Sequence, residues 1–237
     1  MDAAGYVTLT RQSGLMREMQ LIANNIANAS TAGFRREGVV FSEYVRRLDD
    51  APSLSMAHAS ARHIDLTPGE TEMTGATFDF AIEGEGFFLV ETPQGNRLTR
   101  AGMFTPSSEG ELVNPDGHRL LDQGGAPVFV PPDVGQVTLS SDGTLSAGDE
   151  PIARIGLWQP AADGDLQHEG GTLFRTTQGE VPLDGGRMVQ GRIEASNVNP
   201  MSELARMVEV QRAYEDGRSF DRREDDRLRT VIQVFGG

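Results

Sequence analysis

Residues 78–104 read FDFAIEGEGFFLVETPQGNRLTRAGMF, and this stretch indicates the fold class of the middle of the chain. Its apolar runs, such as residues 87–90, are only a few residues long, and glycine-containing segments separate them. The segment Gln94-Gly95-Asn96 is typical of a hairpin turn, so we expect residues 87–90 to pair with residues 97–100. The stretch therefore predicts antiparallel β-strands.

The same pattern continues on the C-terminal side of this stretch. Two further turn signals, Asn-Pro-Asp-Gly at 114–117 and Ser-Asp-Gly at 141–143, separate short apolar runs. The strands expected around and after them are residues 111–113, 119–121, 137–139, 144–146 and 152–158. Glycine contributes 28 of the 237 residues, which is consistent with many tight turns. Short strands at this spacing predict a mainly β central domain at residues 76–192, barrel-like or sandwich-like.

The segment before this domain has a different composition. Residues 49–75 contain Pro52, Pro68-Gly69 and several serines and alanines. Such a composition favours irregular chain over a regular element, so we expect an extended linker there.

The first 48 residues predict a helical segment. Leu15, Met19, Ile22 and Ile26 follow one another at spacings of four, three and four residues, which places them on one face of a helix. We expect the helix to end at residues 28–33, where Gly33 can adopt a left-handed conformation. Because an isolated helix of this length is marginal in water, it needs a partner surface.

Residues 193–237 offer that partner. Asn199-Pro200 is a helix start, with Asn199 as the cap and Pro200 in the first turn. The apolar face that follows consists of Leu204, Met207, Val208, Val210 and Tyr214, and after Gly217 and a charged stretch at 218–229 it resumes with Leu228, Val231, Ile232 and Phe235. We therefore predict that the N- and C-terminal helices pair as a coiled coil and flank the β domain, with Gly217 as a possible interruption.

The distribution of charge limits the classes of partner. The net charge of −14 lies wholly in residues 49–192, which hold 8 Arg and 22 acidic residues, whereas residues 1–48 hold 6 Arg and 4 acidic residues and residues 193–237 hold 7 Arg and 9 acidic residues. An acidic middle argues against nucleic acid or an anionic membrane as partner. Nearly neutral ends repel one another little and suit self-association. The chain has no Cys, which excludes disulfides and thiolate metal sites, and all of its 21 basic residues are Arg.

No residues carry a recognisable catalytic, cofactor or metal motif. Glu83 and Glu85 resemble a glycosidase carboxylate pair only in residue type, because they lie in a glycine-rich segment, and the four histidines lack metal-ligand spacing. Gly84 and Gly86 alone do not make a dinucleotide fingerprint, and the Asp-Gly pairs lack EF-hand spacing. We expect no enzyme, no cofactor and no metal site. A periplasmic peptidoglycan hydrolase and a calcium-dependent adhesin remain as less favoured alternatives.

Three groups of motifs resemble one family. Residues 22–28 (IANNIAN) with 30–36 (STAGFRR), residues 84–88 (GEGFF) with 98–104 (LTRAGMF), and residues 191–199 (GRIEASNVN) with 211–215 (QRAYE) are similar, in this order, to the flagellar rod, hook and hook-associated axial proteins. The length and residues 172–175 (TLFR) resemble a proximal-rod member, and a distal-rod or hook-type member is the alternative. Met103 and the charged stretch 218–229 depart from the family pattern.

The resemblance implies a structural subunit that transmits torque from the motor to the hook. In such proteins the terminal helices pair and line the inner wall of a tube, with the β domain outside them. The implied partners are other proximal and distal rod proteins, further copies of this chain and the flagellar export apparatus, with no nucleic acid and no membrane insertion. The implied location is the basal body in the periplasm. Export through the type III route would account for an N-terminus without an ordinary cleaved signal peptide.

The resemblance and the apolar faces together give an expected assembly interface. Its residues are Leu15, Met19, Ile22, Asn24, Asn25, Ile26, Asn28, Thr31, Gly33, Phe34, Ser196, Asn197, Val198, Leu204, Met207, Val208 and Tyr214. Three Asn within five residues disfavour a helix, and hydrogen bonds between subunits from Asn25 and Asn28 would offset this effect. In the monomer, the ends are expected to be disordered, since their apolar stripes lack a partner surface.

Overall fold

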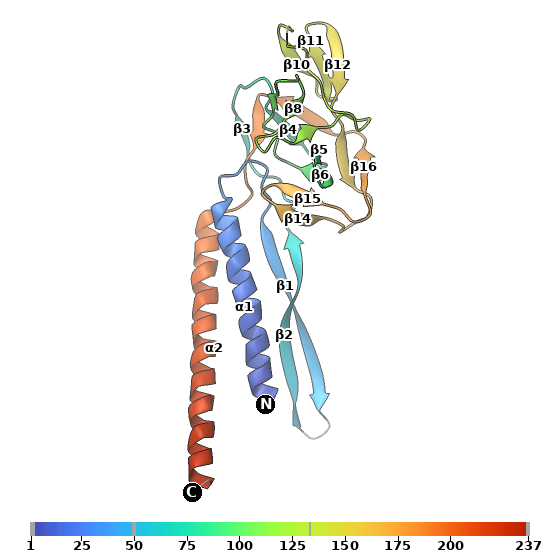
Figure 1. The fold of residues 1–237 in the computed structure, drawn as a ribbon. Helices are drawn as coiled ribbons and strands as arrows, with labels where there is room; N and C mark the ends of the chain where they lie inside the picture. The colour runs from blue at the N-terminus through green and yellow to red at the C-terminus, as the bar shows by residue number, and fades with distance from the viewer. Residues whose placement is uncertain (1–2, 49–50, 133, 236–237) are drawn as a thin grey trace. The chain divides into compact units, whose positions relative to one another are not determined.

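The computed structural model describes residues 3–48, 51–132 and 134–235. The chain divides into two compact units (Figure 1). The helical unit comprises Met1–Ala27, Glu37–Asp65 and Asn199–Gly237, and the β unit comprises Asn28–Arg36 and Leu66–Val198. Each unit is therefore built from segments that lie far apart in the sequence.

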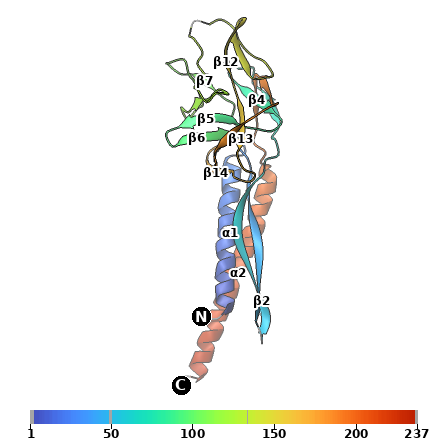
Figure 2. The same cartoon turned by 90° about the vertical axis from the view of Figure 1, so that its right-hand side faces the viewer.

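Two long helices and a hairpin form the helical unit. Helix α1 (Ala3–Ala27) lies alongside helix α2 (Pro200–Phe235), as both views show (Figures 1 and 2). Strands β1 (Glu37–Leu48) and β2 (Ala51–Ile64) pair antiparallel and contact α1. The predicted pairing of the two terminal helices is confirmed. The side chains of Leu228, Val231, Ile232 and Phe235 lie outside the described part of the chain.

The segment expected to be an extended linker differs from that expectation. Of residues 49–75, Ala51–Ile64 form β2, and Thr71–Met73 form the short strand β3. Leu54 and Met56 alternate with serine and alanine in the sequence, which is the period of a strand. Proline and the small residues obscured this period, and β1 supplies the pairing partner that makes it a strand.

The start of α2 and the end of α1 lie at the residues expected from the sequence. The side-chain oxygen of Asn199 accepts hydrogen bonds from the backbone N–H groups of Met201 (3.1 Å) and Ser202 (3.2 Å), which caps α2. After α1, Gly33 adopts a φ of 74°, within the left-handed region. Gly217 does not interrupt α2, which continues through it, and a side-chain carbon at this position would make only an ordinary contact, 3.6 Å from Gln12 of α1.

Antiparallel strands make up the β unit. Its largest sheet has the order β14-β15-β6-β5-β9-β8-β7, and β10-β11-β12, β13-β16, β17-β4 and β18-β3 form smaller sheets. The remaining bounds are β4 (Phe80–Glu83), β5 (Phe88–Thr92), β6 (Gly95–Thr99), β7 (Thr105–Pro106), β8 (Leu112–Val113), β9 (Arg119–Leu120), β10 (Val137–Leu139), β11 (Thr144–Ala147), β12 (Glu150–Arg154), β13 (Leu157–Pro160), β14 (Gln167–Gly170), β15 (Leu173–Arg175), β16 (Glu180–Leu183), β17 (Arg187–Gln190) and β18 (Arg192–Glu194).

The turn signals of the sequence locate the hairpins. Strands β5 and β6 pair up to Thr92 and Gly95, so their turn lies at Pro93-Gln94, just before the predicted position. Asn114 accepts hydrogen bonds from the backbone of Asp116 and His118 at its predicted turn. The strand expected at 152–158 is two strands, β12 and β13, which pair with different neighbours.

One apolar core holds the β unit together. Buried side chains from several of its strands meet in it, and Phe88 and Phe104 pack edge to face, with ring centres 5.6 Å apart. Its members are Phe80, Ile82, Phe88, Val90, Phe104, Leu112, Leu120, Val128, Val130, Val137, Leu145, Ile155, Leu157 and Met188. The predicted fold class, a central mainly β region flanked by N- and C-terminal helices, is confirmed.

Candidate assembly site

Asn25 lies at the centre of a buried polar contact in the helical unit. Its side-chain oxygen accepts a hydrogen bond from the backbone N–H of Glu37 (3.0 Å), and its amide nitrogen donates to the Glu37 carbonyl (2.8 Å) and to the Glu203 carboxylate (3.1 Å). Asn25 is fully buried and Glu203 nearly so. The contact therefore joins α1, the start of β1 and the first turn of α2.

A second polar contact joins the two helices closer to the N-terminus of α1. Arg206 donates hydrogen bonds to the Glu18 carboxylate from Nε (2.8 Å) and approaches it with Nη2 (2.7 Å). The hydrogen bond and the charge of Glu18 raise the pKa of the Arg206 guanidinium above its usual range. Glu18 is buried although it is charged, so the pair fixes how the helices align.

The buried face of α1 is offset from the predicted stripe. Of the stripe residues, Ile22 is buried, whereas Leu15, Met19 and Ile26 are half-buried. The buried positions of α1 recur at helical spacing and include two polar residues: Gly14, Glu18, Leu21, Ile22 and Asn25. The prediction was offset because it counted apolar residues only.

Helix α2 presents two different faces. Glu203 and Val210 are buried, and Met207 and Tyr214 are half-buried. Met201, Leu204 and Val208 recur at spacings of three and four residues, and their exposed fractions are 74%, 48% and 47%. We call these three residues the exposed α2 stripe. An apolar stripe that faces water on a helix already packed on its other side is a surface suited to association.

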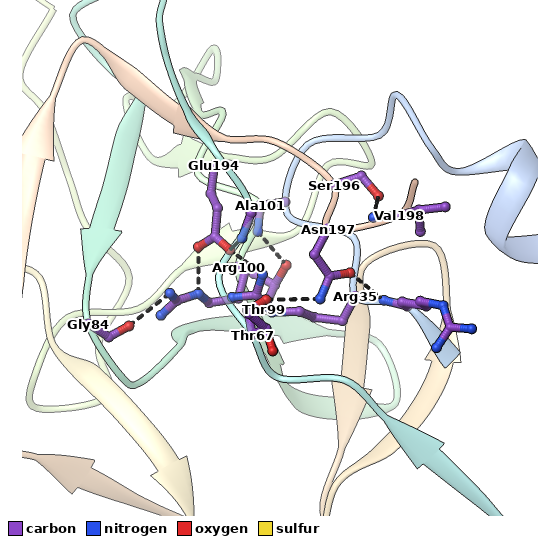
Figure 3. A network of polar contacts seen from close by, with 12 residues as sticks. Arg35, Thr67, Gly84, Thr99, Arg100, Ala101, Glu194, Ser196, Asn197 and Val198 are labelled. Atoms are coloured by element: carbon purple, nitrogen blue, oxygen red, sulfur yellow. Dashed lines mark hydrogen bonds and ion pairs between the residues drawn. The ribbon is translucent and has the colours of Figure 1, made fainter. Parts of the chain in front are cut away.

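The segments that enter and leave the β unit are tied together by a buried charge cluster. Glu194 accepts a hydrogen bond from Arg100 Nε (2.8 Å), forms an ion pair with Arg35, and accepts a hydrogen bond from the backbone of Gly69 (3.0 Å). Arg100 also donates to the carbonyl of Gly86 (2.5 Å) and, as Figure 3 shows, to the carbonyl of Gly84 (2.9 Å). We call Arg35, Arg100 and Glu194 the Arg–Glu–Arg cluster. Burial lowers the pKa of Arg100, an effect that Glu194 opposes and Arg35 increases.

Neighbouring residues strengthen the same junction. Asn197 accepts a hydrogen bond from the backbone of Arg36 (2.7 Å) and donates to the Thr67 carbonyl (2.9 Å), as Figure 3 shows for the Thr67 contact. Phe34 is fully buried and its ring meets that of His168 edge-on. A side chain at Gly33 would collide with the backbone of Ala101. The junction thus ties residues 33–36 to residues 194–197 and to the central strands.

Three family models match the chain in the order of these parts. They are described as flagella basal body rod protein (residues 6–35), flagellar hook protein FlgE/F/G D1 domain (residues 81–147) and flagellar basal body rod FlgEFG protein C-terminal (residues 189–233). The flagellar basal-body rod protein FlgF of Caulobacter vibrioides is 38% identical over 221 residues, which cover 91% of this chain and 90% of the relative. The chain belongs to the family of flagellar basal-body rod proteins.

Other rod proteins match with similar coverage. FlgF of Mesorhizobium japonicum is 35% identical, over 98% of this chain and 97% of the relative. FlgG of Bacillus subtilis is 27% identical, over 97% of each chain. This rod protein is a structural protein and not an enzyme. The terminal family matches cover most of α1 and most of α2, and the central match extends from β4 to the end of β11.

The expected interface residues fall into three groups in this rod protein. Ile22 and Asn25 are buried within the helical unit, and Gly33, Phe34 and Val198 are buried in the chain. The half-buried residues are Leu15, Met19, Ile26, Asn28, Thr31, Ser196, Asn197, Met207 and Tyr214, and the exposed ones are Asn24, Leu204 and Val208. The donors of Asn25 are both used within the chain, which gives this residue an internal role. The expected hydrogen bonds between subunits from Asn25 and Asn28 stay a prediction.

Sequence reasoning missed the charged residues of the two contacts. Glu18, Glu203 and Arg206 stand at helix positions that an apolar pattern counts as solvent-facing. A signal was nevertheless present, because Glu18 stands one helical turn before Ile22 on the buried face, and Glu203 one turn before Met207. Carboxylates on the buried faces of two pairing helices predict polar contacts between those helices.

The described residues offer little support for a peptidoglycan hydrolase or a calcium-dependent adhesin. Glu83 lies on the surface, where its Oε2 is 3.8 Å from Nε of the exposed Arg187. The described part of the chain holds no group of three or more side chains that could bind a metal ion. Within the same residues, neither long helix has an apolar stretch sufficient to span a membrane.

Proposed function

We propose that this rod protein is a subunit of the proximal rod, and that it assembles through the exposed α2 stripe against the terminal helices of a neighbouring rod subunit. The stripe carries the proposal. Met201, Leu204 and Val208 face away from the buried residues Glu203 and Val210 of the same helix. Burying three large apolar side chains in a neighbour stabilises an assembly by roughly 1.5–3 kcal/mol per fully buried side chain.

The partners follow from the family. Other rod proteins and further copies of this chain are the proposed neighbours in the tube, and the subunit would transmit torque through them to the hook. We place the assembled protein in the periplasm and infer export through the flagellar apparatus without a cleaved signal peptide. Greater identity to two FlgF relatives than to the FlgG relative supports a proximal position.

The test of the position is electron microscopy of basal bodies from a strain that lacks this protein. Rings with a short stub or no rod would support a proximal position, and a long stub would support a distal one. Normal rods with filaments would overturn the proposed function.

The test of the interface uses the same strain complemented with variants. Leu204→Glu and Val208→Glu place a charge in the stripe, and Val181→Glu places one on an exposed position of β16 as the matched control. We expect motility and rods to be lost with the stripe variants and kept with the control, provided that purified variants show wild-type helix content. Normal rods with both stripe variants would refute the proposed interface, independently of the function.

A further inference from the structure

The β unit contains a pocket of about 540 Å³ beside the Arg–Glu–Arg cluster. Arg35 and Arg100 line it together with residues 84–87, and residues 159–164 form another wall. The volume lies within the range of small-ligand sites. Neither the proposed function nor the family match gives this pocket a role.

The charges of the buried Arg–Glu–Arg cluster do not balance. Arg35, Arg100 and Glu194 are each at most 3% exposed, and together they carry two positive charges and one negative charge. Both carboxylate oxygens of Glu194 are already engaged, one by Arg100 and the other by Arg35 and Gly69. One positive charge in the cluster is therefore left without a partner among these residues.

One donor of the cluster is also unused. The Nε, Nη1 and Nη2 donors of Arg100 reach Glu194, Gly86 and Gly84, respectively. The Nε–H group of Arg35, in contrast, is buried and has no hydrogen-bond acceptor in the described part of the chain. A buried charged donor without an acceptor is destabilising unless something else provides one.

We propose that this pocket is a binding site for a carboxylate. A monoanion neutralises the single excess positive charge, and a planar carboxylate fits a guanidinium group geometrically. A dianion such as phosphate fits less well, because Glu85 and Asp163 on the pocket wall are exposed carboxylates that repel a second negative charge. The same carboxylate chemistry can come from a free small acid or from a Glu or Asp side chain of another protein chain.

The site can be measured on the full-length protein. Trp158 is the only tryptophan, and it immediately precedes Gln159 and Pro160 of the pocket wall, so its fluorescence reports on this region. Sodium acetate is titrated against sodium chloride at the same ionic strength, with Trp158 fluorescence and the melting temperature as readouts. We expect a saturable change and a higher melting temperature with acetate only.

Variants separate binding at this pocket from a general salt effect. Arg35→Gln should weaken acetate binding at least tenfold. Glu85→Gln removes a repelling charge and should tighten binding on the order of fivefold. Glu109→Gln makes the same change at an exposed position outside the pocket and should leave binding unchanged. If Arg35→Gln does not fold, the comparison of Glu85→Gln with Glu109→Gln decides whether acetate binds at this pocket.

A pair of blocked peptides identifies the source of the carboxylate. Tighter binding of acetyl-Gly-Glu-Gly-amide than of acetate, with no binding of the Gln peptide, would support a side chain of another chain. Binding of acetate equal to or tighter than that of the Glu peptide would support a free acid. Identical curves for acetate, the Glu peptide and chloride, or equal affinities for the Glu85→Gln and Glu109→Gln variants, would overturn the proposal. None of these measurements depends on rod assembly.

Discussion

Replacement of Glu194 by Gln should destabilise the β unit strongly. In the wild-type protein this carboxylate holds Arg100, Arg35 and the backbone of Gly69, and it is 2% exposed. Glutamine has nearly the same shape and can still accept a hydrogen bond, but it removes the only negative charge of the Arg–Glu–Arg cluster. Two buried guanidinium groups then lie close together without a counter-charge.

The magnitude follows from the burial of the cluster. Removing one partner of a buried ion pair costs about 3–5 kcal/mol, because the remaining charge stays in a region that water does not reach. With a urea dependence of about 1–3 kcal/mol per molar, the unfolding midpoint should fall by roughly 1–5 M. Urea unfolding followed by Trp158 fluorescence measures this shift, since Trp158 lies in the β unit.

An exposed ion pair supplies the matched control. Glu83→Gln makes the same chemical change next to Arg187, in a pair whose side chains are 53% and 69% exposed. Exposed pairs contribute about 0–1 kcal/mol, so the midpoint should hardly move. If Glu194→Gln and Glu83→Gln shift the midpoint equally, the Arg–Glu–Arg cluster does not stabilise the β unit and the reasoning is refuted.

Three further changes test other contacts. Asn25→Ala should lower the free energy of unfolding of the helical unit by about 2–4 kcal/mol, because buried groups of Glu37 and Glu203 lose their hydrogen-bond partner. Circular dichroism at 222 nm measures this loss, and Asn24→Ala, at an exposed position, should not cause it. Equal effects of the two substitutions would argue against an internal role for Asn25. Gly33→Ala should unfold or severely destabilise the β unit, because of the left-handed backbone and the collision with Ala101, and a melting temperature near wild type would contradict this. Hydrogen bonds from the Thr177 side chain, and then from the backbone of Gln178, lower the pKa of Asp165. The Asp165 carboxylate therefore stabilises the fold above the usual pKa of Asp, and this stabilisation is lost as the pH falls through the lowered pKa. The melting temperatures of the wild type and Asp165→Ala should differ at neutral pH and converge in acid, and a difference that stays constant with pH would refute the assignment.

Much of the fold could be predicted from local sequence signals. The Asn199 cap, the end of α1 before Gly33, and the turns at 114–117 and 141–143 each depend on a few adjacent residues with restricted backbone chemistry. The paired helices followed from apolar spacing, which required a partner surface. In each case the physical cause acts within one or two turns of chain, so a single sequence contains it.

The parts that could not be predicted depend on distant partners. Strand β2 has little apolar character, and β1 makes it a strand. Asn25, Glu18 and Glu203 are polar residues at buried positions, and only the opposite helix and the start of β1 explain why they are there. The same holds for Arg35 and Arg100, which meet through Glu194, 94 residues beyond Arg100.

These polar contacts have a common role that apolar packing alone would not fulfil. An apolar stripe such as that of α1 tolerates a slip of one helical turn, because another apolar side chain takes each place. The contacts of Asn25 with Glu203 and of Glu18 with Arg206 tolerate no slip, since a shift would leave a buried carboxylate without its donor. We infer that they set the register in which chain segments more than 170 residues apart join, and that the Arg–Glu–Arg cluster does the same in the β unit. A tube built from repeated copies needs one subunit shape, and residues that penalise every other alignment provide it.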